Sequence, residues 1–127
     1  MEIIRIDHIV LTVRDIEKTC EFYSRVLGMR VETFQNGRKA LRFGGQKINL
    51  HQAGREFEPK AAQPTPGSAD LCFITYDPLD KVMADIRSAG ENILLGPVER
   101  LGAMGPIESV YIRDPDGNLI EIANNIH

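Results

Sequence analysis

Short apolar runs alternate with amphipathic stretches along this chain, and each type of stretch predicts one kind of element. The first apolar run, residues 7–13, is rich in β-branched side chains and predicts a buried strand. Asp15 then stands where an N-cap belongs, and Gly28 supplies the left-handed residue that ends a helix. Between them the apolar residues recur at helical spacing: Ile16, Cys20, Tyr23, Val26 and Leu27. The pattern therefore predicts a strand followed by a helix that stops at Gly28.

The second half of the chain has the same design. Residues 69–75 predict a strand, Asp77 is the expected cap, and Pro78 stands at the favoured first helical position. An apolar stripe follows at Leu79, Val82, Met83 and Ile86, and Gly90 is the expected end. Each of three pairs of landmarks is separated by 62 positions: His8 and Asp70, Asp15 and Asp77, and Gly28 and Gly90. This common spacing indicates an internal duplication.

Three shorter extended pieces are expected after each helix. They are residues 30–34, 40–43 and 47–52 in the first half, and residues 92–95, 109–113 and 119–123 in the second. Turns are expected at 36–37, 44–45 and 114–118. We therefore predict an α+β fold in which two βαβββ modules, about 1–53 and about 69–127, form one domain of 127 residues. Residues 54–68, which contain three prolines, are the expected linker.

Residues 96–106 form a segment rich in glycine and apolar side chains. Two interpretations remain open for it. It is a mobile lid that excludes water from a reactive intermediate, or it is a plain long connection between strands.

Composition narrows the class of protein and its partners. The chain is 43% hydrophobic and 26% charged, with a net charge of −3 and no basic block, so binding to nucleic acid is not expected. No apolar run is long enough to span a membrane, and the first 13 residues do not resemble a secretory leader. Cys20 and Cys72 lie far apart and form no CxxC pair, so we expect both to be reduced packing residues of a cytoplasmic protein.

Polar residues gather on one face of the predicted sheet. Successive strand residues point to opposite faces, so parity places the helix-facing apolar residues on one side and the polar ones on the other. The face away from the helices is expected to carry His8, Asn49, His51, Asp70 and Glu121. Such residues are often simple rim or capping groups. Glu121, however, interrupts an apolar strand, where a carboxylate requires a cation, a set of hydrogen-bond donors or a proton of its own.

The chemistry of these side chains suits a divalent metal such as zinc, manganese, iron or nickel. Arg38, Arg100 and Arg113 are available as anchors for an anionic substrate, although surface arginines usually have no specific role.

Two segments resemble the vicinal-oxygen-chelate superfamily. Its opening module is matched by residues 7–15 with Phe22-Tyr23 and Leu27-Gly28-Met29, and its closing hairpin by residues 114–121. The resemblance spans essentially the whole chain, and it is strongest for the small bacterial glyoxalase-domain proteins described as virulence-associated or dioxygenase-like. It implies a cupped mixed sheet with the helices on its outer face, a metal at its floor and a homodimer.

The resemblance also implies roles for individual residues. His8 matches the first-strand metal ligand and Glu121 the closing carboxylate. Asp70 falls where a histidine is usual, and Asn49 falls where glyoxalase I usually has glutamate. Asp70 is still an adequate oxygen ligand, and His51 is a substitute for Asn49 as a ligand. The implied metal ligands are therefore His8, His51, Asp70 and Glu121, and no organic cofactor is expected.

By resemblance, the expected activity is that of a lyase or isomerase of the glyoxalase type. Nickel, zinc, cobalt, manganese or iron would chelate a small α-hydroxycarbonyl or hemithioacetal substrate, and Glu121 or Asp70 would move the proton. Two alternatives stay open. One is an extradiol ring-cleavage dioxygenase, against which the missing second histidine counts. The other is a metal-free, drug-binding dimer like the bleomycin-resistance proteins, against which the absence of tryptophan counts.

Overall fold

A computed structural model describes residues 1–126, and the chain divides between Gly67 and Ser68 into two compact units. We call them module one and module two and describe each by itself. Each has one helix and a four-stranded mixed sheet, which confirms the predicted α+β fold with two βαβββ modules. That the two modules form one domain stays a prediction.

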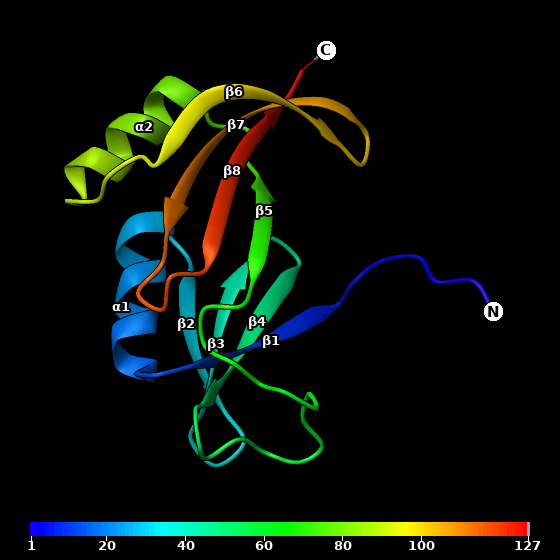
Figure 1. Cartoon of the computed structure of the whole chain (residues 1–127). Helices are drawn as coiled ribbons and strands as arrows, with labels where there is room; N and C mark the ends of the chain where they lie inside the picture. Colours follow the sequence, from blue (N-terminus) through cyan, green and yellow to red (C-terminus); the bar gives the residue numbers. More distant parts are fainter. Residues whose placement is uncertain (127) are drawn as a thin grey trace. The chain divides into compact units, whose positions relative to one another are not determined.

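Module one contains the first half of the predicted elements (Figure 1). They are β1 (His8–Val13), α1 (Ile16–Leu27), β2 (Arg30–Phe34), β3 (Arg38–Phe43) and β4 (Gln46–Gln52). The strand order is β1-β4-β3-β2, with β1 parallel to β4 and the other pairs antiparallel. The helix packs on β2, β3 and β4, and the core beneath it includes the fully buried Val13, Tyr23, Leu41, Ile48 and Leu50.

Module two repeats this topology. Its elements are β5 (Asp70–Ile74), α2 (Leu79–Ser88), β6 (Leu95–Gly102), β7 (Gly105–Arg113) and β8 (Leu119–Asn125). The order is β5-β8-β7-β6, again with one parallel pair, β5 and β8. The helix packs on β7 and β8 over the buried Ile86, Val110, Ile112 and Ile120. The register makes the two sheets equivalent, because Val10 pairs with Asn49 and Cys72 pairs with Glu121.

The helix ends agree with the sequence in module one and differ in module two. The Asp15 side chain accepts a hydrogen bond from the Lys18 amide at 3.1 Å, and Gly28 has a φ of 67°, as predicted. In α2 the predicted Asp77 cap is wrong, because Pro78 occupies the N-cap position without a side-chain hydrogen bond. Gly90 has the expected positive φ of 83° just after the helix.

Residues 95–113 form a β-hairpin, so the interpretation of 96–106 as a plain connection between strands was wrong, and its role as a mobile lid stays a prediction. The predicted strand 92–95 was also misplaced, since β6 begins at Leu95. Glycine and proline are unusual inside a strand, but β6 tolerates Gly96 and Pro97 because it is an edge strand with a bulge between Leu95 and Val98. At Gly96 the backbone comes so close to β7 that an added Cβ would lie 2.5 Å from the carbonyl oxygen of Ser109.

Both cysteines are free, but only one of them is a packing residue. Cys20 is buried in module one, whereas Cys72 is exposed on β5, contrary to expectation. Neither helix in residues 1–126 is long and apolar enough to cross a membrane.

Candidate functional site

Glu121 lies at the centre of the open face of module two, the face that α2 does not cover. Its strand neighbours Ile120 and Ile122 are buried on the helix side, as parity predicted. Cys72 is beside Glu121 on β5, and Tyr111 is beside it on β7. The carboxylate is half-buried, so it needs hydrogen-bond donors or a cation near it.

A buried serine holds this carboxylate. The Ser109 hydroxyl donates a hydrogen bond to Oε2 of Glu121 at 2.5 Å, and Ser109 itself is fully buried. Ser109 was not among the residues predicted for the site, although its position two residues before Tyr111 on one strand places both side chains on the same face. A charge-assisted contact of this length fixes the orientation of the carboxylate.

Cys72 adds a thiol to the same face. Partial burial of the sulfur, the neighbouring Glu121 carboxylate and the more distant Asp70 together raise the pKa of Cys72 to about 11. The thiol is therefore protonated at neutral pH and is able to donate a hydrogen bond, but it is a poor nucleophile.

A cavity of about 380 Å³ opens at Glu121 within module two. Its walls are Cys72, Ile74, Arg100, Leu101, Gly102, Ala103, Met104, Ile107, Tyr111, Glu121 and Asn125. Most of these side chains are apolar and come from the β6–β7 hairpin. Arg100 supplies a positive charge, and its Nε donates to the Tyr111 hydroxyl at 3.0 Å. The cavity thus combines one carboxylate and one guanidinium in apolar surroundings, a composition typical of a small-molecule site.

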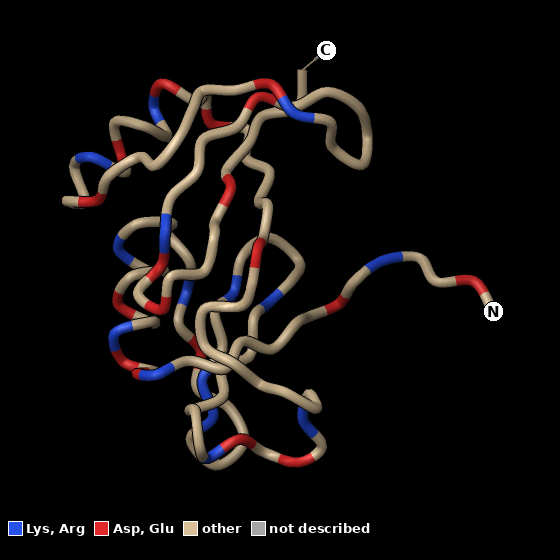
Figure 2. The backbone as a smooth tube through the Cα atoms, in the orientation of Figure 1, with Lys and Arg blue, Asp and Glu red and all other residues tan. Residues whose placement is uncertain are grey.

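Asp70 starts β5 and is exposed on the same face as Glu121. It pairs with Leu119, two residues before Glu121, so the two carboxylates occupy diagonal positions on adjacent strands. Figure 2 shows these acidic positions in red along β5 and β8. Their oxygen donors fit a divalent cation. Within residues 1–126, however, no group of three or more His, Cys, Asp and Glu side chains is placed to hold one.

Module one carries the two predicted histidine ligands at opposite ends of its ladder. His8 pairs with Lys47 and Thr12 pairs with His51, so His51 lies four residues further along the strands than His8. At about 3.3 Å per residue this offset is about 13 Å. Module one therefore does not bring the two imidazoles together. His8 is exposed, and its Nδ1 lies 2.9 Å from a carboxylate oxygen of Asp7.

His51 is buried and already has a cationic neighbour. Its Nε2 lies 3.4 Å from a terminal nitrogen of Arg38, which can only donate, so Nε2 is the acceptor. The Phe57 ring packs edge-on against the imidazole, with centroids 5.6 Å apart. Burial and then the Arg38 charge lower the pKa of His51 below its usual value, so the ring is neutral at pH 7. Asn49 and His51, which were predicted to lie on an open face of the sheet, are therefore both buried.

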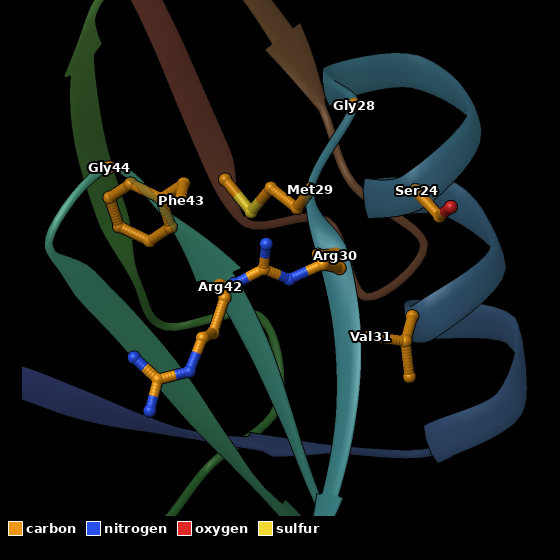
Figure 3. A pocket seen from close by; sticks show the side chains of 8 residues that line it. All are labelled: Ser24, Gly28, Met29, Arg30, Val31, Arg42, Phe43 and Gly44. Carbon is orange, nitrogen blue, oxygen red and sulfur yellow. The ribbon is translucent and has the colours of Figure 1, made fainter.

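A second cavity, of about 530 Å³, lies at the edge of module one. Figure 3 shows Arg30 and Arg42 extending from the neighbouring strands β2 and β3, with Met29 and Phe43 beyond them. Arg30 and Arg42 are cross-strand partners, and Arg42 is ion-paired with Glu32. None of the predicted site residues lines this cavity.

Comparisons with known proteins agree with this architecture. A virulence protein of Salmonella typhimurium is 63% identical over 126 residues, 99% of this chain and 88% of its own length. Its crystal structure matches with a TM-score of 0.98 over 99% of this chain and 100% of that chain. A glyoxalase domain-containing protein of Mycosarcoma maydis is 55% identical over 119 residues, 94% of this chain and 67% of its own length.

A lactoylglutathione lyase of Arabidopsis thaliana is a more distant relative, 26% identical over 91% of this chain and 42% of its own length. The family model for the glyoxalase, bleomycin resistance protein and dioxygenase superfamily matches residues 5–122. The match covers most of both modules, including β1, which carries His8, and the strand that carries Glu121. The chain therefore belongs to the glyoxalase/bleomycin resistance protein/dioxygenase superfamily.

Proposed function

We propose that this protein is a divalent-metal-dependent lyase or isomerase of the glyoxalase type, with a small α-hydroxycarbonyl or hemithioacetal substrate. The observation that carries the proposal is the Glu121 carboxylate, held by the buried Ser109 at the wall of an apolar cavity. Membership of a superfamily that includes a lactoylglutathione lyase supports the reaction class.

By resemblance to the superfamily, the proposed metal ligands are Glu121, Asp70 and His8. Two carboxylates and an imidazole suit nickel, zinc, cobalt, manganese or iron. His51 joins this set only if Arg38 releases its Nε2, because one lone pair cannot serve both partners. When bound, the ion would supply a Lewis acid that polarises the carbonyl oxygen of the substrate.

Glu121 is the proposed acid–base group. A carboxylate that accepts a proton from one carbon and returns it to the next must keep one orientation, and the Ser109 hydrogen bond provides it. Leu101, Met104 and Ile107 contribute apolar side chains to the walls of the cavity beside this carboxylate. Asp70, exposed at the start of β5, is the second carboxylate for this role.

The two alternative activities have less support from the residues. An extradiol dioxygenase needs two histidines and a carboxylate on one iron, and the ladder of module one holds His8 and His51 four residues apart. A drug-binding groove needs aromatic platforms for stacking, and Tyr111 is the one aromatic side chain among those that line the cavity at Glu121.

The experiment compares wild type with Glu121→Gln, and the matched control is Glu108→Gln. Glu108 is an exposed carboxylate on the neighbouring strand β7, on the opposite face of the same sheet. Bound metal is measured by elemental analysis on protein purified without chelator, and activity is measured with the hemithioacetal of methylglyoxal. We expect metal and activity in wild type and in Glu108→Gln. In Glu121→Gln the metal content should fall and the rate should drop about 1,000-fold.

Two results would decide against the proposal. If wild type neither carries nor binds any of the five metals, the metal-dependent activity is wrong and a ligand-binding dimer becomes the better account. Stoichiometric iron with cleavage of a catechol would instead favour the dioxygenase.

The proposed assembly is a homodimer. Apolar side chains such as Val10 in module one and Ile74 in module two are about half exposed in the single chain, and a second copy would bury surface of this kind. Light scattering during size-exclusion chromatography should give twice the 14.2 kDa mass of one chain. A monomeric mass at the concentration used for activity assays would exclude the dimer.

A further inference from the structure

Two polar atoms on the open face of module one are buried without a hydrogen-bond partner. They are Nε of Arg38 and Oδ1 of Asn49, neither of which has a partner among the residues that the structure describes. Asn49 is only 7% exposed. Leaving a buried donor and a buried acceptor unpaired costs free energy, so natural proteins usually pair such groups with a protein group, a water molecule, an ion or a ligand.

The ladder places these two groups beside each other. Ala40 on β3 pairs with Asn49 on β4, and Arg38 is two residues before Ala40 on the same face. The contact between Arg38 and Nε2 of His51, two residues beyond Asn49, confirms that Arg38 points along this face toward β4. Arg38 and Asn49 are thus diagonal partners on adjacent strands. Residues in diagonal positions are about 7–8 Å apart, so one small molecule can contact both side chains.

Aromatic rings fix the Arg38 guanidinium. Its central carbon lies 5.2 Å from the centroid of Phe34 and 4.4 Å from that of Phe57. Cation–π contacts on two rings restrict the side chain, so Nε keeps its place when no ligand is bound. The acceptor on His51 satisfies one terminal nitrogen of the guanidinium. The group is therefore pre-organised and positively charged, with a donor unpaired.

The surrounding charges favour an anion. Arg30, Arg42 and Lys47 share this face with Arg38, and Glu32, its carboxylate on β2, β3 and β4, is paired with Arg42. Beside these strands, Glu56 also acts on His51, and this carboxylate is paired with Lys60. Figure 2 shows the basic positions in blue on these strands. A cationic surface of this kind raises the local concentration of anionic ligands.

We propose that Arg38 and Asn49 form a binding site for an α-hydroxycarboxylate. Such an acid offers the two groups that the site lacks, a carboxylate oxygen to accept from Nε of Arg38 and an adjacent hydroxyl to donate to Oδ1 of Asn49. A simple carboxylate satisfies only Arg38. Phe57, which is 45% exposed and covers both Arg38 and His51, is the side chain that moves to admit the ligand.

The site goes beyond the proposed lyase function and does not need the metal. No proposed ligand residue other than His51 contacts Arg38, and the donors and acceptors involved are all in module one. Tests in the presence of a chelator therefore separate the two proposals. Loss of the metal-dependent activity with the acid still bound would refute only the proposed function.

The experiment titrates full-length protein in EDTA, at constant ionic strength, with L-lactate and with propionate, which differ only in the hydroxyl group. Amide chemical shifts in ¹H–¹⁵N spectra report the binding. We expect wild type to bind lactate about fivefold more tightly than propionate, the effect of one net hydrogen bond. The largest shifts should fall on residues 38–40, 49–51 and 57.

Three substitutions assign the atoms. Arg38→Gln should weaken both acids more than tenfold, and Arg38→Lys, which keeps the charge but lacks the Nε–H donor, should weaken them as well. Asn49→Leu, of similar volume, should abolish the preference for lactate and leave propionate unchanged. Arg30→Gln is the matched control, since it removes the same charge from the same face beside the 530 Å³ cavity.

The proposal is overturned if lactate and propionate bind equally, if neither causes saturable shifts, or if Arg30→Gln weakens binding as much as Arg38→Gln. The last result would show general attraction to a basic face, or binding in the cavity lined by Arg30. Thermal melts of each variant show which of them are folded. If Arg38→Gln does not fold, Arg38→Lys and Asn49→Leu still test the site.

Discussion

Asn49 in module one and Glu121 in module two occupy the same place in two sheets of one topology. Each lies on the fourth strand, opposite equivalent residues of the parallel first strand, Val10 and Cys72. Around Asn49 the open face is basic and ends in a buried, neutral His51. Around Glu121 it carries carboxylates, a protonated thiol and an apolar cavity.

The difference shows that two modules of the same topology can carry different chemical groups on equivalent faces. The buried faces of both sheets must stay apolar to pack against a helix, so they tolerate little change. The open faces do not pack against a helix, so their side chains can differ: we propose an anion-binding surface in one module and an acid–base site in the other. The backbone ladder keeps both sets in register.

The largest expected difference between the modules is in how much the turn between the third and fourth strands contributes to stability. In module two the buried Asp114 accepts from the Asp116 and Asn118 amides and from the Asn118 side chain, all at 2.8–2.9 Å. Asp114→Ala leaves these buried donors unpaired and should lower the free energy of unfolding by about 3 kcal/mol. Urea denaturation measures it. Asp85→Ala, which removes only an exposed ion pair with Lys81, should cost at most about 0.5 kcal/mol.

In module one, the stability of the corresponding turn, Gly44-Gly45 between β3 and β4, should depend on backbone conformation instead of on side-chain hydrogen bonds. Gly44 has a φ of +49° in open space, so Gly44→Ala meets no clash and should cost only the conformational strain of about 1 kcal/mol. Gly45→Ala is the control in the same turn, because Gly45 does not have a positive φ and should tolerate alanine. Equal losses for both alanines would argue that the turn depends on something other than Gly44.

The acidic face of module two should suppress the reactivity of Cys72. Because the pKa of Cys72 is about 11, alkylation by iodoacetamide at pH 8 should be much slower than that of a free cysteine. Glu121→Gln removes one cause of the raised pKa and should speed the reaction severalfold, whereas Glu108→Gln should not. Mass spectrometry of the peptide that contains Cys72 gives the rate. Alkylation of wild type at the free-cysteine rate would contradict the assigned surroundings of the thiol.

The smallest expected effect is a dependence of stability on pH in module one. The pKa of His51 is lowered in the folded state from the usual value of about 6.5, so the unfolded state binds the proton more readily. Stability due to His51 is therefore complete above about pH 6.5 and is lost as the pH falls through that value toward the folded pKa. Melting wild type and His51→Gln between pH 7.5 and 5.5 should show the steeper loss in wild type. Arg38→Gln should reduce this loss only in part, because burial is the larger cause.

Much of the fold could be predicted from local patterns. The first helix with its Asp15 cap and Gly28 end, the repeat spacing, and the strand faces that place Ile120 and Ile122 inward all follow from residues close in sequence. The β6–β7 hairpin could not be predicted in this way. Its Gly96-Pro97 pair is typical of a loop, and only its place at the edge of a sheet makes it compatible with a strand.

The candidate sites divide in the same manner. Alternation along a strand is a local property of the chain, so local patterns were enough to predict which residues share an open face. His8, His51, Asp70 and Glu121 were among the residues predicted there. The tertiary structure determined which other side chains contact them. Ser109 reaches Glu121 from 12 residues away and Arg38 reaches His51 from 13, and these contacts depend on ladder register, which pairing between strands sets and no single segment encodes.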